Sequence, residues 1–317
     1  GDASVYFKKD FTLSRPVKRA VLYACGLGYH SLLLNGEQLD DAVLDPAFSD
    51  YTKHCYFTML PGLEKLLQTE NCLAVAVGQG WRRNIEGYLQ RMPEFFGIPQ
   101  LAAVLSVEYE DGSKEVLYTD ESWLYGGGPV TYAHLFNGET YDASRRSEEW
   151  LRFGTAPAGF ASAVRTEGPG GRAAVMRLEP IREQEIYPVQ TVIPLKEDVC
   201  VVDFGQNIAG VCALRLPQGM APGQTVRLSF SEFLDEDGSL YMATLRTAKS
   251  TDTYIAAGDE RDLTVWKPQF TYHGFRYAEI HGLGMIDPED IWAVSCYTDA
   301  ATDSFFRCGS AVLNAVQ

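Results

Sequence analysis

The sequence lacks any long apolar run and any surplus of basic residues. No uninterrupted apolar stretch approaches the ~18 residues that a membrane-spanning helix needs, so we expect no membrane partner. Lysine and arginine number 27 against 42 aspartates and glutamates, which gives a formal net charge of −15. Because an acidic surface repels phosphate backbones and anionic lipids, nucleic acid is not an expected partner. The net charge does not exclude uncharged ligands such as sugars.

Motifs of the common catalytic and metal-binding families are also missing. The chain contains no Walker loop, HExxH, GxSxG or paired CxxC motif. Its five histidines are scattered, without two at the helical i, i+4 spacing of a metal site. Asp235–Gly238 begins like a calcium loop, but Thr244 stands where that loop needs a glutamate, so we expect a hairpin turn there. The sequence therefore predicts no catalytic residue and no metal site of a recognised pattern.

Disulfide and export signals are weak as well. Seven cysteines are present, an odd number, and several lie within apolar runs, as Cys212 does in GVCALRL. Buried free thiols are the expected state, and they favour a reducing compartment. The first residues, GDASVYFKKDF, have no signal-peptide core. These two features favour the cytoplasm, and the localisation is otherwise open.

What the sequence does contain is alternation with a period of two. In Arg19–Cys25, alternate residues are apolar on both faces, which predicts a strand covered on both sides. Asn35-Gly36 and Asp111-Gly112 are hairpin-turn signals. A second series of strands begins at Cys200, and strand candidates recur every 10 to 15 residues or so, as in β-sandwiches. The sequence therefore predicts an all-β fold.

Helical patterns are confined to two short places. Leu63, Leu66 and Leu67 have helical spacing, and Ser310 is a suitable N-cap for a helix over the last residues. A helix of about eight residues is not stable alone. The chain thus ends as though a helical domain were about to begin.

Six ordered blocks cover most of the chain and resemble those of bacterial α-L-rhamnosidases. They are ACGLGYHSLLLNGEQLDDAVLDPAFSDYTKHCYF, NCLAVAVGQGW, FNGETYDASR, VVDFGQNIAGVCALRL, SEFLDEDGSLYMATLRTAKSTDTYIAAG and WKPQFTYHGFRYAEI. The tail FFRCGSAVLNAV resembles the lead-in to the family's helical barrel. The resemblance implies a jelly-roll-like β-domain at residues 1–179 and a concanavalin-like β-sandwich at 180–300. A truncated helical stub, the start of the catalytic barrel, would follow at 301–317.

The resemblance also implies an activity for the parent protein. The family hydrolyses terminal α-L-rhamnose from plant glycosides and polysaccharides with inversion, which needs two carboxyl groups roughly 6.5–9.5 Å apart. In the family both come from the helical barrel. We therefore expect this chain to be a non-catalytic portion, inactive by itself. Its expected partners are a rhamnose-containing carbohydrate and the missing catalytic domain. A stand-alone rhamnose-type carbohydrate-binding module is the alternative.

One polar cluster invites a carbohydrate-binding hypothesis. Amides and carboxylates bind vicinal hydroxyls, and an aromatic ring covers the C–H face of a sugar. The predicted binding residues are Trp81, Asn137, Glu139, Tyr141 and Asp142. The alternative is that Glu139 and Asp142 anchor loops around a buried Trp81.

A calcium ion at this cluster is a further implication of the resemblance. Some relatives bind rhamnose with calcium in this domain, and Asn137 or Asp142 would supply oxygen ligands here. Gln79 stands where many relatives have Asp or Asn, which argues against the ion. No other cofactor is expected.

The segment Asp203–Asn207 has two interpretations. The polar side chains of DFGQN are typical of a strand end with a bulge, where they satisfy turn backbone groups. Packing against the missing barrel is the other interpretation.

Overall fold

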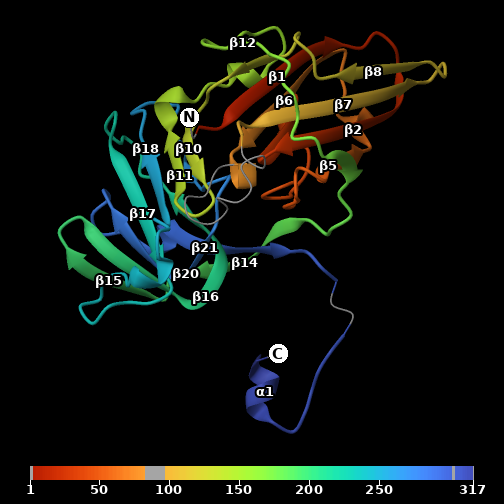
Figure 1. The fold of residues 1–317 in the computed structure, drawn as a ribbon. Helices are drawn as coiled ribbons and strands as arrows, with labels where there is room; N and C mark the ends of the chain where they lie inside the picture. Colours follow the sequence, from red (N-terminus) through yellow and green to blue (C-terminus); the bar gives the residue numbers. More distant parts are fainter. Residues whose placement is uncertain (1–2, 83–96, 302–303, 317) are drawn as a thin grey trace.

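The computed structural model describes residues 3–82, 97–301 and 304–316, and these residues are almost entirely strands and loops. Figure 1 shows two β-sheet bodies side by side, with the chain end leading away from them. The predicted all-β fold is confirmed. No helix in the described ranges is both long and apolar enough to cross a bilayer.

Two sheets face each other in the first body (Figure 1). The six-stranded sheet has the order β12-β9-β1-β6-β3-β4. Its strands, in chain order, are β1 (Val5–Thr12), β3 (Tyr29–Leu34), β4 (Glu37–Gln38), β6 (Glu70–Gly78), β9 (Leu124–Gly126) and β12 (Ala161–Ser162). The five-stranded sheet has the order β13-β5-β2-β7-β8. Its strands are β2 (Val17–Leu27), β5 (His54–Pro61), β7 (Gln100–Tyr109), β8 (Lys114–Tyr118) and β13 (Arg172–Val175).

Alternating apolar residues form the core between these two sheets. Leu22 from β2, Leu32 from β3 and Val75 from β6 are at most 1% exposed and belong to one cluster. The predicted turn at Asn35-Gly36 joins β3 to β4, and both residues have positive φ (54° and 84°), as a two-residue hairpin turn requires. Local patterning thus accounts for this sandwich.

The second body is built on a ten-stranded sheet that curls around the 17-residue strand β16 (Val199–Arg215). The path runs β10-β11-β18-β17-β20-β16-β21-β14, and β15 and β19 also pair with β16. The other strands are β10 (Val130–His134), β11 (Gly138–Asp142), β14 (Ile181–Pro188), β15 (Thr191–Lys196), β17 (Thr225–Ser231), β18 (Thr251–Ile255), β19 (Val265–Trp266), β20 (His273–His281) and β21 (Ile291–Thr298).

A bulge divides β16 into halves that pair with different strands. The first half pairs with β15, the second with β21, and the register with β20 shifts between Asp203 and Ile208. Gly205 has a φ of 81°, and its N–H donates to the Asp203 carboxylate at 2.6 Å. Both oxygens of that carboxylate accept from Arg276 at 2.8 Å, which lowers the pKa of Asp203. The predicted bulge is confirmed, but the predicted strand end is wrong, because β16 continues to Arg215 and the Asn207 amide donates to Glu232.

The hairpin β10–β11 belongs to the sheet of the second body, although it lies in the first half of the chain. Thr140, Tyr141 and Asp142 of β11 pair in parallel with β18. The division into domains at residues 1–179 and 180–300 stays a prediction. The strands of residues 130–142 belong to the ten-stranded sheet of the second body.

Besides the core of the first body, a second hydrophobic cluster spans both bodies. A single cluster contains Tyr29 and Ala76 from the first body together with Phe270 and Phe275 from the second. The ring of Phe270 packs so closely on Gly78 that a Cβ there would lie 2.3 Å from Cγ of Phe270. The bodies are therefore packed rather than merely tethered.

Short helical segments occur at the two predicted places. Leu63–Lys65 is a single 3₁₀ turn, η1. The C-terminal helix α1 (Ala311–Val316) begins after Ser310, whose hydroxyl accepts from the Leu313 N–H at 3.4 Å. In Figure 1 α1 lies apart from both bodies, at the end of an extended segment.

Candidate functional site

The aromatic member of the predicted cluster, Trp81, lies half-buried in the 3₁₀ turn η2 (Gly80–Arg82) that follows β6. Its ring packs edge-on between Phe48 and Phe136, with centroids 4.8 and 6.0 Å away. Phe48 is 50% exposed, so this trio reaches the surface beside the β10–β11 hairpin.

Asn137 follows Phe136 in the turn between β10 and β11. Its amide donates to the Tyr132 hydroxyl at 3.0 Å, and its Oδ1 accepts from the Lys249 N–H at 3.1 Å. Its backbone carbonyl accepts from Thr251 at the start of β18. Asn137 thus fastens the hairpin to the neighbouring strand.

Glu139 is fully buried, and its carboxylate holds the loop before β20. One oxygen accepts from the Phe270 N–H at 2.9 Å, and both lie within 3.2 Å of the Gln269 nitrogen. Burial raises the pKa of Glu139 to about 8, and the nearby charge of Asp252 adds to the rise. These contacts correspond to the anchoring alternative for this residue.

Tyr141 and Asp142 lie further along β11. Tyr141 is 6% exposed and stacks on Tyr254, with centroids 5.6 Å apart and planes 5° from parallel. Burial raises its pKa to about 12. Asp142 caps the 3₁₀ turn η4 (Ala143–Arg145) by accepting from the Ser144 N–H at 3.0 Å.

Trp81 thus packs against Phe136, the chain neighbour of Asn137, whereas Glu139 and Tyr141 lie in the core. Gln79, the residue in doubt as a calcium ligand, is 2% exposed, and its amide donates to the Ala3 carbonyl at 3.2 Å. Within the described ranges no three His, Cys, Asp or Glu residues are grouped to hold a metal ion. Sugar binding by the five residues stays a prediction.

A second polar group, which the sequence pattern missed, lies beneath the hairpin. Ser250 Oγ is 3.1 Å from Nδ1 of His273, and Nε2 of His273 is 3.1 Å from both carboxylate oxygens of Asp252. Each residue is at most 4% exposed. This Ser-His-Asp chain is therefore buried in the fold. The sequence indicates only that Asp252 is buried, because Asp252 and the buried Tyr254 lie on the same face of β18.

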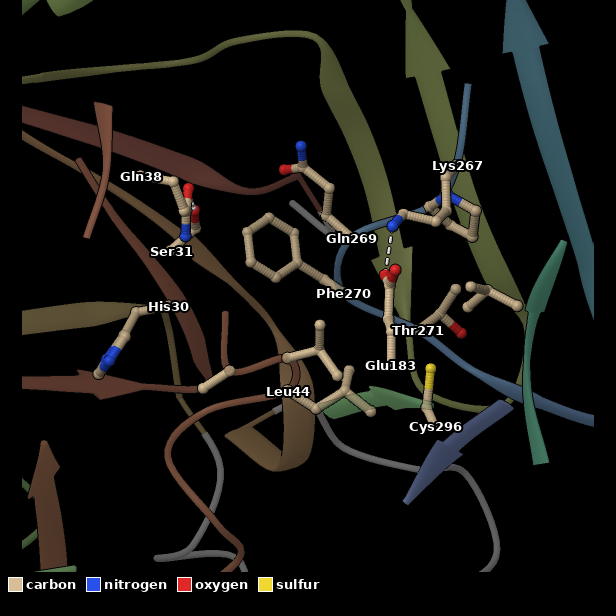
Figure 2. Close-up of a pocket in the computed structure, with 14 residues that line it drawn as sticks. His30, Ser31, Gln38, Leu44, Glu183, Lys267, Gln269, Phe270, Thr271 and Cys296 are labelled. Atoms are coloured by element: carbon tan, nitrogen blue, oxygen red, sulfur yellow. Dashed lines mark hydrogen bonds and ion pairs between the residues drawn. The ribbon is translucent and has the colours of Figure 1, made fainter. Parts of the chain in front are cut away.

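A cleft between the two bodies is the third candidate (Figure 2). Its volume is about 160 Å³. Ser31 and Gln38 line it from the first body, and Glu183, Lys267 and Gln269 from the second. Lys267 and Glu183 form an ion pair inside it. Because the lining comes from segments far apart in the sequence, no local motif signals the cleft.

Comparison with known proteins finds matches to α-L-rhamnosidases over both bodies. Residues 15–185 match the model of the α-L-rhamnosidase N-terminal domain, and residues 193–297 match that of the bacterial α-L-rhamnosidase concanavalin-like domain. An α-L-rhamnosidase of Formosa agariphila is 30% identical over 327 residues, covering 99% of this chain and 34% of its own length.

Solved structures of two α-L-rhamnosidases superpose closely. That from Dictyoglumus thermophilum has a TM-score of 0.89 at 32% identity, with 98% of this chain and 34% of the other covered. That from Streptomyces avermitilis, complexed with L-rhamnose, has a TM-score of 0.90 at 31% identity, with 98% and 30% covered. The chain therefore spans about a third of the length of these relatives.

Proposed function

Since the chain belongs to the bacterial α-L-rhamnosidase family through its N-terminal and concanavalin-like domains, we propose that it is the non-catalytic β-sheet portion of such an enzyme. The whole protein would hydrolyse terminal α-L-rhamnose from glycosides or polysaccharides. This portion would support a catalytic domain that lies in the remaining length of the relatives.

The main support for the proposal is that the chain spans only about a third of the length of its relatives. The two domain models match residues 15–185 and 193–297, and the chain aligned over 98–99% of its length covers 30–34% of these relatives. The remaining two thirds have room for a separate catalytic domain.

The single acidic residue of the cleft also supports the proposal that this portion is non-catalytic. Inverting hydrolysis needs one carboxylic acid and one carboxylate on opposite sides of the glycosidic bond. The cleft between the bodies is lined by 14 residues, of which Glu183 is the single acidic one, and it is paired with Lys267. Such a lining offers no acid–base pair.

The experiment is an assay of nitrophenol release from p-nitrophenyl α-L-rhamnoside by the purified 317-residue chain. We expect no release above the rate of buffer alone. Release that follows the protein peak through two chromatographic steps, with one rate per mole of chain, would overturn the proposal.

A stand-alone carbohydrate-binding module is the second candidate function. It is favoured by the partly exposed aromatic rings of Phe48 and Trp81, because a flat ring at the surface can cover the C–H face of a sugar. Calorimetric titration with L-rhamnose, with and without calcium, tests it. Heat of binding that Trp81→Ala abolishes would support the module, and a flat titration of the unaltered chain would reject it.

A further inference from the structure

The cleft between the two bodies is assembled from both of them. Figure 2 shows Ser31 and Gln38 on one side, Lys267 and Glu183 on the other, and the ring of Phe270 between them. Ser31 comes from β3, Glu183 from β14, and Lys267 from the loop that Glu139 anchors. The cleft exists only while the two bodies are packed together.

Its size suits one small ring. The volume is about 160 Å³, and an engineered protein cavity of roughly 150 Å³ takes up benzene. A pyranose has a six-membered ring of similar size, and its hydroxyls extend beyond the ring. Those hydroxyls would have to meet polar groups at the mouth.

The floor of the cleft is apolar. Leu44, Val211 and Phe270 line it and are between 2% and 7% exposed. Cys296 adds a thiol whose pKa burial raises to about 12, so it is uncharged at neutral pH. A ligand placed here would bury a C–H face or a methyl group against this floor.

The rim is polar but carries no net charge. Ser31 donates to the amide oxygen of Gln38 at 3.1 Å, and the exposed amide of Gln269 stands opposite. The ammonium of Lys267 and the carboxylate of Glu183 neutralise each other. Amides, a hydroxyl and a paired carboxylate provide both donors and acceptors, which suits vicinal hydroxyls better than an anion such as phosphate.

We propose that this cleft is a subsite for a single neutral pyranose whose apolar side faces Leu44 and Val211 and whose hydroxyls meet Gln38, Lys267 and Gln269. A 6-deoxyhexose fits best, because its methyl group meets the apolar floor; this choice of sugar rests on the proposed function. The subsite differs from the cluster around Trp81, with which its lining has no residue in common.

The test is a ligand-observed NMR titration of the 317-residue chain with methyl α-L-rhamnopyranoside. Methyl α-L-mannopyranoside, which adds only the 6-hydroxyl, is the matched ligand and is expected to bind more weakly. In the double variant Lys267→Met/Gln269→Ala the dissociation constant is expected to rise at least tenfold, because two hydrogen-bonding groups are lost. Gln206→Ala, an exposed glutamine on the β16 bulge, is the control and should leave it unchanged.

Two further readouts separate this site from the other one. Trp81→Ala is expected to leave the affinity unchanged, and the amide resonances of Gln269 and Thr271 should shift on titration. The inference is wrong if the unaltered chain does not bind, if the double variant binds as well as the unaltered chain, or if Trp81→Ala alone abolishes binding. None of these outcomes changes the expected absence of hydrolysis, so failure of the subsite is distinguishable from failure of the proposed function.

Discussion

At the scale of single residues, Glu139 connects the most separate parts of the molecule. It lies on β11, its backbone N–H donates to Asp252 of β18 at 2.9 Å, and its carboxylate holds Gln269 and Phe270. Phe270 in turn packs on Gly78 of the first body. One buried carboxyl group therefore supports the hairpin, the cleft loop and the contact between the bodies.

Glu139 should make stability depend on pH. Its pKa is raised from the ordinary 4.5 to about 8 by burial, so the folded state holds this proton more tightly than the unfolded state. Its contribution is complete below pH ~4.5 and is lost as the pH rises through 8, with a slope near 1.4 kcal/mol per pH unit. We expect Glu139→Gln to remove this decline.

The check is urea denaturation of both proteins between pH 5 and 9. Glu149→Gln, which changes an exposed carboxylate, is the matched control and should retain the decline of the unaltered chain. A Glu139→Gln profile parallel to that of the unaltered chain would show that Glu139 stays ionised in the folded protein.

At the scale of elements, β6 packs closely against the loop before β20 and so joins the two bodies. Gly78→Ala should destabilise the chain by about 1–3 kcal/mol, the usual cost of overpacking, because its new methyl group meets the ring of Phe270. Gly127→Ala is the control, since nothing lies within 4 Å of a Cβ there. The midpoints of urea denaturation of the two variants and of the unaltered chain measure these differences in stability.

A double variant distinguishes a clash from a general loss of packing. Phe270→Leu makes room for the methyl group, so Gly78→Ala should cost less in that background than in the unaltered chain. Equal costs in both backgrounds would mean that the two residues are not coupled.

Local sequence patterns predicted most elements but not their long-range pairing. Alternation in Arg19–Cys25 corresponds to β2, Asn35-Gly36 to the turn after β3, and Ser310 to the start of α1. The parallel pairing of β11 with β18 joins residues more than 100 positions apart, and no spacing rule contains it.

The same limit applies to the candidate site. The NGETYD motif predicts either a sugar-binding or a loop-anchoring role, but whether Glu139 faces solvent or the core depends on β18 and on the loop at Gln269. The cleft could not be predicted at all, because its lining combines segments that are adjacent only after folding.

At the scale of the whole molecule, the two bodies form a scaffold with a shared core and an acidic surface. One hydrophobic cluster runs from Tyr6 in the first body to Ile291 in the second. The chain spans about a third of its relatives, and the acidic pair of an inverting glycosidase is not found in the cleft between its bodies. We therefore propose that the residues that hydrolyse the glycosidic bond lie in the part of the relatives that this chain does not cover.

The most direct measurement compares two proteins in one assay: the 317-residue chain and, as positive control, the α-L-rhamnosidase of Streptomyces avermitilis, of which the chain covers 30%. The substrate is p-nitrophenyl α-L-rhamnoside, and the quantity is nitrophenol released per mole of protein. We predict turnover by the control alone. Equal turnover by the 317-residue chain would contradict it.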